Sequence, residues 1–313
     1  MSASEAIESP APLASHRAAR RKRSDAQPTG GPGQSPLGRV LPRVTLLLVC
    51  LAWTVPTLGL LISSVRPRDA IANSGWWTVF AQPFEFVTNA TFEHYSTVLN
   101  AGMGPAFFNS LVVSIPATVI PILVAAFAAY AFAWMRFPGR EILFVVIVGL
   151  MVVPIQATFI PLLRLFGQFG ITGSFVAVWL AHAGFGMPLA IYLLRNYMGS
   201  LPREVIESAT VDGASHFQTF WRLMVPLSVP ALAAFAIFQF LWVWNDLLVA
   251  MVFLGGGRTE VVTLTLTGLI GSRGQDWHVL TAGGFITMTV PLLVFFSLQR
   301  YFVRGLTAGS VKG

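Results

Sequence analysis

Charged residues are scarce in this chain of 313 residues: they make up 11% of it, against 55% hydrophobic residues. A soluble domain carries about a quarter charged residues, and the mean hydropathy here is +0.69. The apolar residues fall into almost charge-free runs of roughly 20 residues, the length that crosses a bilayer as a helix. The composition therefore excludes a soluble protein and predicts a polytopic membrane protein.

Cysteine and lysine are rarer still. The single Cys50 excludes an intrachain disulfide framework and a multi-cysteine metal site. The two lysines, Lys22 and Lys312, are followed by Arg23 and Gly313, whereas a phosphate-binding loop needs Gly-Lys-Ser/Thr. None of the five histidines begins a His-Glu-x-x-His zinc helix. We therefore expect no nucleotide, cofactor or metal site in this chain, and no enzyme activity.

The apolar runs also lack the ionisable groups of an ion-coupled carrier. Only His182 and Asp246 lie inside them, whereas such carriers place acids, histidines or arginines near the bilayer midplane. The absence disfavours a secondary carrier. Ion-dependent flux catalysed by the purified chain alone would favour it again.

The chain divides into a tail, residues 1–43, and an apolar part, residues 44–313. The tail is rich in Ser, Ala, Pro, Gly and Arg, which predicts a disordered segment. Its basic run, residues 20–23, indicates a solvated topology determinant in preference to an anionic-lipid patch. The remainder predicts six membrane-spanning helices, at about 44–65, 107–134, 142–163, 174–194, 228–254 and 279–299.

The distribution of basic residues predicts the orientation. With the N-terminus inside, fifteen Lys and Arg lie in the inner segments and five in the outer ones. Positive charge accumulates on the cytoplasmic side of membrane proteins. We therefore expect both termini in the cytoplasm.

The cytoplasmic segment 196–227 is too long for a turn and predicts two short helices. Pro202 suits a first helical turn, and Gly213 suits the left-handed position that ends a helix. Ser215 and Gln218 form a capping-box pattern that begins the second helix, which we expect to end at Pro226.

The second helix carries an apolar stripe at i, i+3, i+4 and i+7, formed by Phe217, Phe220, Trp221 and Met224.

Two other interpretations of this segment are a DNA-binding motif and a structural loop. A DNA-binding helix-turn-helix is disfavoured, because the segment has only two arginines and no lysine against three acids, so attraction to phosphates would be negligible. A structural loop without a partner remains open on this physics alone.

The residues after Ile206 resemble a known motif. Glu207-Ser208-Ala209-Thr210-Val211-Asp212-Gly213-Ala214, with Pro226 thirteen residues after Gly213, resembles the EAA motif of ATP-binding-cassette (ABC) importer permeases. It departs from the usual pattern at Ser208, at Leu223 and at Val225, all small or apolar exchanges.

Other residues point to a subgroup of these permeases. The chain resembles the smaller permease of maltose-type and trehalose-type carbohydrate importers over residues 44–313. The matches are Tyr95, Asn109-Ser110, residues 201–204, Trp244-Asn245-Asp246 and the tail 299–313. A permease for another solute remains the alternative.

The resemblance implies an all-α fold of six transmembrane helices in the bacterial inner membrane, with a cytoplasmic coupling loop. It implies as partners a second, non-identical permease, two ATPase subunits that bind ATP and Mg, and an extracytoplasmic sugar-binding protein. The residues implied in ATPase coupling are Glu207, Ser208, Ala209, Asp212, Gly213, Ala214 and Pro226. The C-terminal residues Ser310, Val311, Lys312 and Gly313 are implied in a further ATPase contact, and segment 255–277 in contact with the binding protein.

Three polar residues in or beside predicted spans are candidates for the substrate pathway: Gln156, Asn245 and Asp246. The amide of Gln156 can donate to and accept from sugar hydroxyls, although a polar contact between helices is the favoured interpretation. The identity of the sugar does not follow from the sequence, because the cavity would be shared with a second chain.

Overall fold

The computed structural model describes residues 36–255, 259–269 and 276–308, and every regular element among them is a helix. The chain divides into two compact units, Met1–Pro56 and Thr57–Gly313. The first long helix, α2 (Pro36–Val65), contributes residues to both. Residues 36–43, which we expected to be disordered, form its first turns, since proline fits the start of a helix. The rest of the predicted tail lies outside the described residues.

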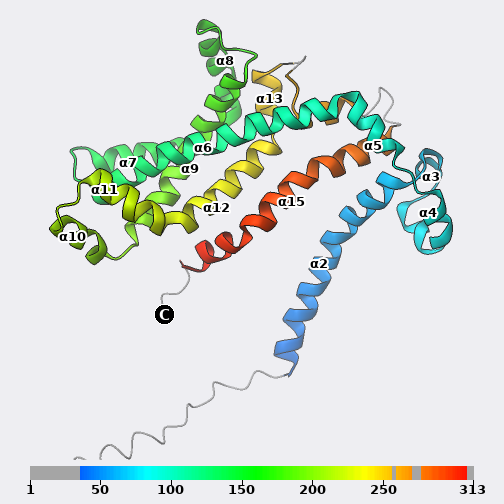
Figure 1. The fold of residues 1–313 in the computed structure, drawn as a ribbon, viewed down its shortest axis with the longest axis horizontal. Coiled ribbons are helices and arrows are strands. Elements are labelled where there is room, and N and C mark those ends of the chain that lie inside the picture. Colours follow the sequence, from blue (N-terminus) through cyan, green and yellow to red (C-terminus); the bar gives the residue numbers. More distant parts are fainter. Residues whose placement is uncertain (1–35, 256–258, 270–275, 309–313) are drawn as a thin grey trace, which may run out of the picture. The chain divides into compact units, whose positions relative to one another are not determined.

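The second unit begins with short helices, after which long helices alternate with further short ones (Figure 1). In chain order they are α3 (Arg68–Asn73), η1 (Trp76–Phe80), α4 (Pro83–Asn89), α5 (Glu93–Val98), η2 (Leu99–Met103), α6 (Gly104–Trp134), α7 (Arg140–Gly149), η3 (Leu150–Val152), η4 (Ile155–Thr158), α8 (Phe159–Gln168), α9 (Phe175–Gly199), α10 (Arg203–Val211), α11 (His216–Thr219), η5 (Phe220–Met224), α12 (Val225–Trp244), α13 (Leu248–Phe253), α14 (Val262–Gly268) and α15 (Trp277–Ala308).

Five helices are long and apolar enough to cross a membrane, and a bent helix pair supplies a sixth span if its halves act together. The five are Val40–Val65, Glu93–Trp134, Phe175–Gly199, His216–Trp244 and Trp277–Gln299. They include the predicted first, second, fourth and sixth spans, so the all-α membrane fold is confirmed.

The third predicted span is not one helix. Its residues belong to two segments, Arg140–Val152 and Ile155–Gln168, which are bent by 99° at their junction. The cause is Pro154: a proline disfavours helical geometry at the residue before it, and Val153 is extended, with φ −70° and ψ 123°. The predicted third span, 142–163, is therefore sharply bent at Pro154 and counts as one span only if its two halves act together.

The fifth predicted span, 228–254, ends earlier than expected. Helix α12 stops at Trp244, and residues 248–253 form the separate helix α13. Asp246 causes the second start, since its carboxylate accepts the backbone N–H groups of Val249 and Ala250 at 2.8 and 3.2 Å.

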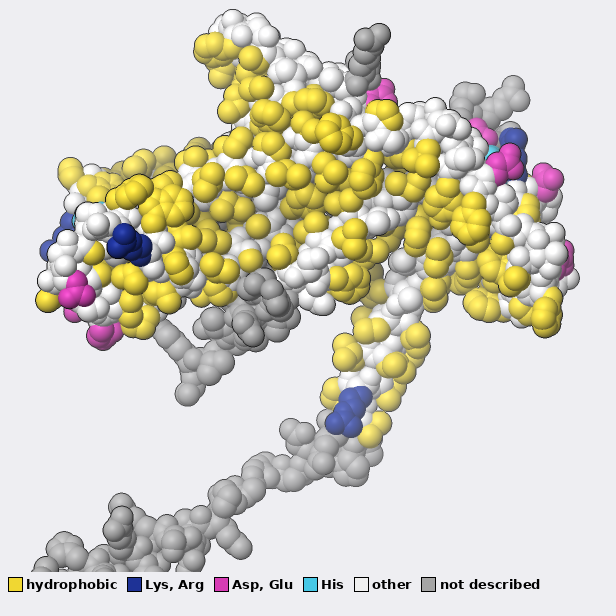
Figure 2. Space-filling model, in the orientation of Figure 1, with side chains coloured by type: hydrophobic (Ala, Val, Ile, Leu, Met, Phe, Trp, Pro, Cys, Tyr) yellow, Lys and Arg dark blue, Asp and Glu magenta, His cyan; other side chains and the backbone are white. Residues whose placement is uncertain are grey.

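The core of the second unit is built around α6 and α9. Buried Ala125, Ala129 and Ala190 allow these two helices to approach closely, and α12 packs against both of them and against α15. Apolar side chains cover the face seen in Figure 2, while charged side chains gather at its two ends, near α10 and near α3 to α5. Such a band matches a unit embedded in lipid.

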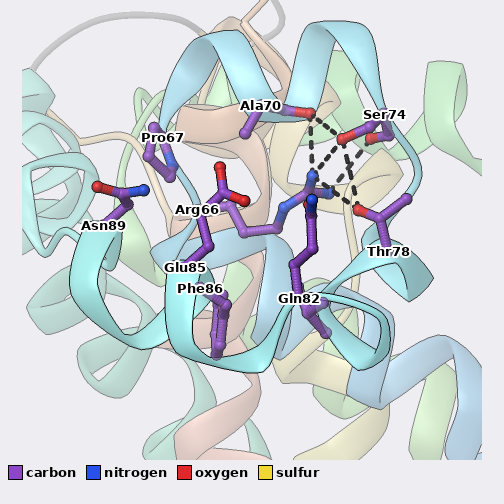
Figure 3. Close-up of a pocket in the computed structure, with 10 residues that line it drawn as sticks. Arg66, Pro67, Ala70, Ser74, Thr78, Gln82, Glu85, Phe86 and Asn89 are labelled. Carbon is purple, nitrogen blue, oxygen red and sulfur yellow. Dashed lines mark hydrogen bonds between the residues drawn. The ribbon is translucent and has the colours of Figure 1, made fainter.

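A buried arginine organises the segment between the first two spans (Figure 3). Arg66 is only 5% exposed, and its guanidinium donates to the carbonyls of Ala70 and Ser74 at 3.0 and 3.2 Å. It also donates to the hydroxyl of Ser74. Its own carbonyl lies 2.8 Å from His94 Nε2. Burial lowers the pKa of Arg66 below its ordinary value, and the charge is stabilised by oxygens of α3 and the turn after it.

Replacing Arg66 by methionine should loosen this segment. Hydrogen bonds from a charged group contribute about 1.5–3 kcal/mol each, and Arg66→Met removes several at once. Hydrogen–deuterium exchange of residues 67–81 should therefore accelerate. Arg68→Met is the matched control, because Arg68 is 63% exposed and only approaches Asp276 at 3.6 Å. Equal exchange in the two variants would contradict the role given to Arg66.

Candidate functional site

The segment between α9 and α12, residues 200–224, is termed the α10–α11 loop. Helix α10 ends in a left-handed glycine, as predicted: Gly213 has φ +78°. The Gly213 N–H donates to the Thr210 carbonyl at 3.1 Å, and the Ala214 N–H donates to the Ala209 carbonyl at 2.9 Å. These two bonds form a Schellman motif. The chain reverses sharply here because glycine adopts this conformation without a Cβ penalty.

The predicted capping box follows at once. Ser215 N–H donates to Gln218 Oε1 at 2.9 Å, and Gln218 N–H donates to Ser215 Oγ at 3.3 Å. The helix that starts here does not end at Pro226, as we expected. It passes through a π-helical turn, η5, into α12, where Pro226 occupies the first turn. A proline is tolerated at that position because its missing N–H leaves no interior hydrogen bond unmade.

Aromatic contacts hold the α10–α11 loop against α6. Tyr130 Oη lies 2.9 Å from His216 Nδ1, and Phe127 stacks on Phe220 with 4.4 Å between ring centroids. Phe220 and Met224 are buried as the apolar stripe predicted, whereas Phe217 is 67% exposed. The second helix is therefore fixed to the membrane-spanning core on one side only.

The other side of the loop is open. Val211 is 86% exposed, Ser208 and Asp212 are exposed, and a Cβ added to Gly213 would meet nothing within 4 Å. Ala209, in contrast, is buried and packs inward. The turn therefore presents an exposed apolar residue and an exposed acid with open space beside them.

The structure does not bring the three predicted pathway residues into one cavity. Gln156 is exposed in η4, at the bend of the helix pair. Asn245 donates to the Leu241 carbonyl of its own helix at 2.8 Å. Asp246 caps α13 and lies 3.8 Å from His182 Nε2.

A cavity that the sequence did not indicate lies beside the bend. It has a volume of about 360 Å³, and its described lining carries no charge. Its aromatic walls are Phe185, Phe238 and Trp242, and its polar groups are Thr158 and Gln239. This size and composition fit a small-molecule site. A signal was present: Gln239 is a polar residue within the apolar run 228–244, three residues before Trp242.

Gln239 is fully enclosed in this conformation. Its amide nitrogen donates to the carbonyls of Ala117 and His182 at 3.2 and 3.3 Å, while its Oε1 finds no partner among the described residues. An unpaired buried acceptor costs roughly 1–3 kcal/mol. Gly186 leaves the space for it, since a Cβ there would lie 2.5 Å from Gln239 Oε1.

Several of the other residues quoted for the resemblance form hydrogen bonds between separate segments of the chain. Asn109 donates to the Glu260 carbonyl, and Ser110 Oγ accepts the Val262 N–H, at 2.8 and 2.9 Å. Tyr95 Oη pairs with Ser64 at 2.8 Å, and Trp244 donates to the Thr287 carbonyl at 3.1 Å. These bonds tie the segment after α13 to the start of α6, the end of α2 to α5, and α12 to α15.

Some predicted contacts lie outside the described residues. They are Ser310, Val311, Lys312 and Gly313, together with residues 256–258 and 270–275 of the predicted outer segment. Within the described ranges, no cluster of His, Cys, Asp and Glu could hold a metal ion.

Comparison with known proteins gives consistent matches. The family described as "Binding-protein-dependent transport system inner membrane component" matches residues 121–308. The chain is 60% identical to the osmoprotective compounds uptake permease protein GgtD of Synechocystis sp., covering 86% of this chain and 91% of that protein. It is 46% identical to the alpha-glucoside transport system permease protein AglG of Rhizobium meliloti, covering 86% and 96%.

A solved structure shares the fold. A chain of a bacterial alginate ABC transporter, crystallised in complex with a periplasmic protein, matches with a TM-score of 0.59 and 15% identity. The match covers 84% of this chain and 94% of that one.

The left-handed turn at residue 213 can be tested by itself. Gly213→Ala should destabilise the α10–α11 loop by about 1 kcal/mol, because only the alanine pays the steric cost of positive φ. Hydrogen exchange of residues 203–219 should accelerate about fivefold. Gly199→Ala is the control, since that glycine is helical and a Cβ there also meets nothing within 4 Å. Unchanged exchange in Gly213→Ala would argue against the Schellman turn.

Proposed function

This chain belongs to the family of binding-protein-dependent transport system inner membrane components and is therefore a transport subunit rather than an enzyme; from that premise we propose that it is the permease through which an ABC importer takes up a carbohydrate. The observation that carries the proposal is the rigid, open α10–α11 loop, whose sequence resembles the EAA motif. ATP and Mg are bound by separate ATPase subunits.

The α10–α11 loop is the coupling element in this proposal. Asp212, Gly213 and Ala214 form its tip, and Ser208 on α10 is exposed beside them. An ATPase that docks here transmits its closure through α11 into α12, because η5 joins them without a break. The core helices then move as rigid bodies around the pathway. Glu207 offers the ATPase a charge-assisted hydrogen bond, and Pro226 starts the helix that receives the motion.

The remaining partners follow from the same arrangement. A second, non-identical permease completes the pathway, and an extracytoplasmic binding protein delivers the solute to the opposite face. The bias of basic residues orients the α10–α11 loop and both termini to the cytoplasm. Residues 310–313 are a further contact with the ATPases, and segment 255–277 a contact with the binding protein.

An α-glucoside of disaccharide or oligosaccharide size is the substrate class we favour. It is supported by the relative AglG, named for alpha-glucoside transport, and by the uncharged cavity beside Trp242. GgtD, named for osmoprotective compounds, favours a second candidate, and a neutral α-glucoside that acts as an osmoprotectant would satisfy both. Uptake of labelled maltose, trehalose and glycine betaine, each competed with the others, separates these possibilities.

Gly213→Asp should leave the permease in the membrane but weaken ATPase association or uncouple ATP hydrolysis from uptake. The new side chain strains the turn by about 1 kcal/mol or more and occupies the open space where the ATPase docks. Glu207→Ala should have the same effect in milder form. Membrane abundance, ATPase co-purification and sugar uptake should be measured together.

The matched control is Gly268→Asp, at an exposed glycine that ends α14 and also has nothing within 4 Å of its Cβ. That control should retain ATPase association. Normal uptake and ATPase binding in Gly213→Asp would defeat the coupling proposal, and loss of uptake only in proportion to protein abundance would favour a structural loop.

The cavity beside the bend should affect the maximal rate of sugar uptake and not the half-saturating sugar concentration. Trp242→Ala removes an aromatic wall, and an aromatic contact contributes about 0.5–1.5 kcal/mol. We expect the maximal uptake rate to fall three- to tenfold, while ATPase co-purification and the half-saturating sugar concentration, set by the binding protein, stay constant. Trp53→Ala, at a 78% exposed tryptophan of α2, is the control. An unchanged rate would remove this cavity from the pathway.

A further inference from the structure

A second, strongly basic cavity lies where four helices end or begin. It has a volume of about 670 Å³ and opens between the end of α6, the start of α7, the end of α9 and the start of α10. Four of its lining residues are arginines, and one is acidic: Arg136, Arg140, Arg195, Arg203 and Glu207. Neither the coupling proposal nor the sugar pathway uses the positive charge gathered here.

Most of this charge is not neutralised within the described part of the chain. Arg140 pairs with the exposed Glu141 at 2.7 Å. Among the described residues, the other three arginines have no ion pair. The Arg195 guanidinium lies 4.8 Å from the Phe144 ring centroid and donates to Asn196 Oδ1 at 3.2 Å. Like charges around one cavity repel, and a bound anion relieves that repulsion.

The surroundings of the cavity indicate an amphiphilic anion. Its walls include the indole of Trp134, which donates to the Met198 carbonyl at 3.1 Å, and tryptophan gathers at the membrane–water boundary. Directly after Arg140, helix α7 exposes apolar side chains: Ile142 is 74% and Val145 68% exposed. A ligand with a phosphate in the cavity would therefore lay its chains on an apolar helix face.

Apart from the exposed Glu207, which also lines this cavity, the surface proposed for the ATPase lies on another face of α10. Residues 203, 206, 207 and 210 line the cavity, and their i, i+3, i+4, i+7 spacing places them on one face of the helix. Ser208 and Val211 point away from that face and are exposed. An ATPase on the outer face thus leaves the cavity free for another occupant.

We propose that this cavity binds the phosphate headgroup of an anionic phospholipid, with its acyl chains on α7. Basic pockets at the ends of membrane helices are suited to such headgroups, and arginine suits phosphate because its planar fork donates two parallel hydrogen bonds. Bound lipid joins α6, α7 and α9 to the base of α10. It therefore braces the coupling element from the membrane side.

The test uses the purified membrane complex in phosphatidylcholine bilayers with a rising fraction of phosphatidylglycerol. Mass spectrometry of the intact complex counts retained phosphatidylglycerol, and ATP hydrolysis is followed in parallel. Each arginine near an anionic surface contributes about 1 kcal/mol. Arg195→Gln should therefore weaken lipid retention roughly fivefold, and Arg136→Gln combined with Arg195→Gln roughly 25-fold.

Two matched variants separate the cavity from general basic charge and from folding. Arg195→Lys keeps the charge and should retain most of the lipid, whereas Arg43→Gln, at an exposed arginine of α2, should change nothing. Equal lipid loss in Arg43→Gln, or undiminished lipid in the double variant, would overturn the proposal. If the double variant, but not the unsubstituted chain, lost the ATPase subunits in phosphatidylcholine alone, the arginines would be assigned to an ATPase carboxylate instead. Lipid retention requires no transport, so this result is independent of the carbohydrate proposal.

Discussion

A bilayer core offers no water to backbone N–H and C=O groups, so every one of them must find its partner within the protein. This constraint explains why the described residues of the chain form helices, and why polar side chains bind backbone groups where α12 ends and where an irregular segment meets α6. At the end of α12, Asp246 takes over two backbone N–H groups. Near the start of α6, Asn109 and Ser110 bind the backbone of residues 260–262.

The spans are of two kinds: some are continuous and tightly packed, and others are bent or broken. Helices α6 and α9 pack tightly through alanines and form a continuous support. By contrast, one span is bent at Pro154 and another is broken after Trp244. The cavity beside Trp242 lies next to the bend. Irregular backbone at membrane depth is tolerated where it lines a cavity. The bend at Pro154 thus lies beside the cavity that we propose as part of the solute path.

At the other end of α6, the α10–α11 loop joins two chemically different surfaces. Its outer residues are exposed and suit a protein partner, while its inner face closes a cavity lined by arginines. Since α11 continues through η5 into α12, a force applied at Gly213 reaches the helix that carries Gln239 and Trp242. The proposed lipid and the proposed ATPase would act on opposite faces of one short helix.

The sequence by itself determined the membrane class, the approximate positions of the spans, the left-handed turn at Gly213 and the capping box at Ser215. These features depend on composition and on residues a few positions apart, so local physics decides them. Only the tertiary structure decided which polar residues meet. It gave Asp246 a capping role, enclosed Gln239 against Gly186, and gathered arginines separated by up to 67 positions around one cavity. The physical reason is that helix packing sets these distances, and neither hydropathy nor motif spacing records how helices pack against one another.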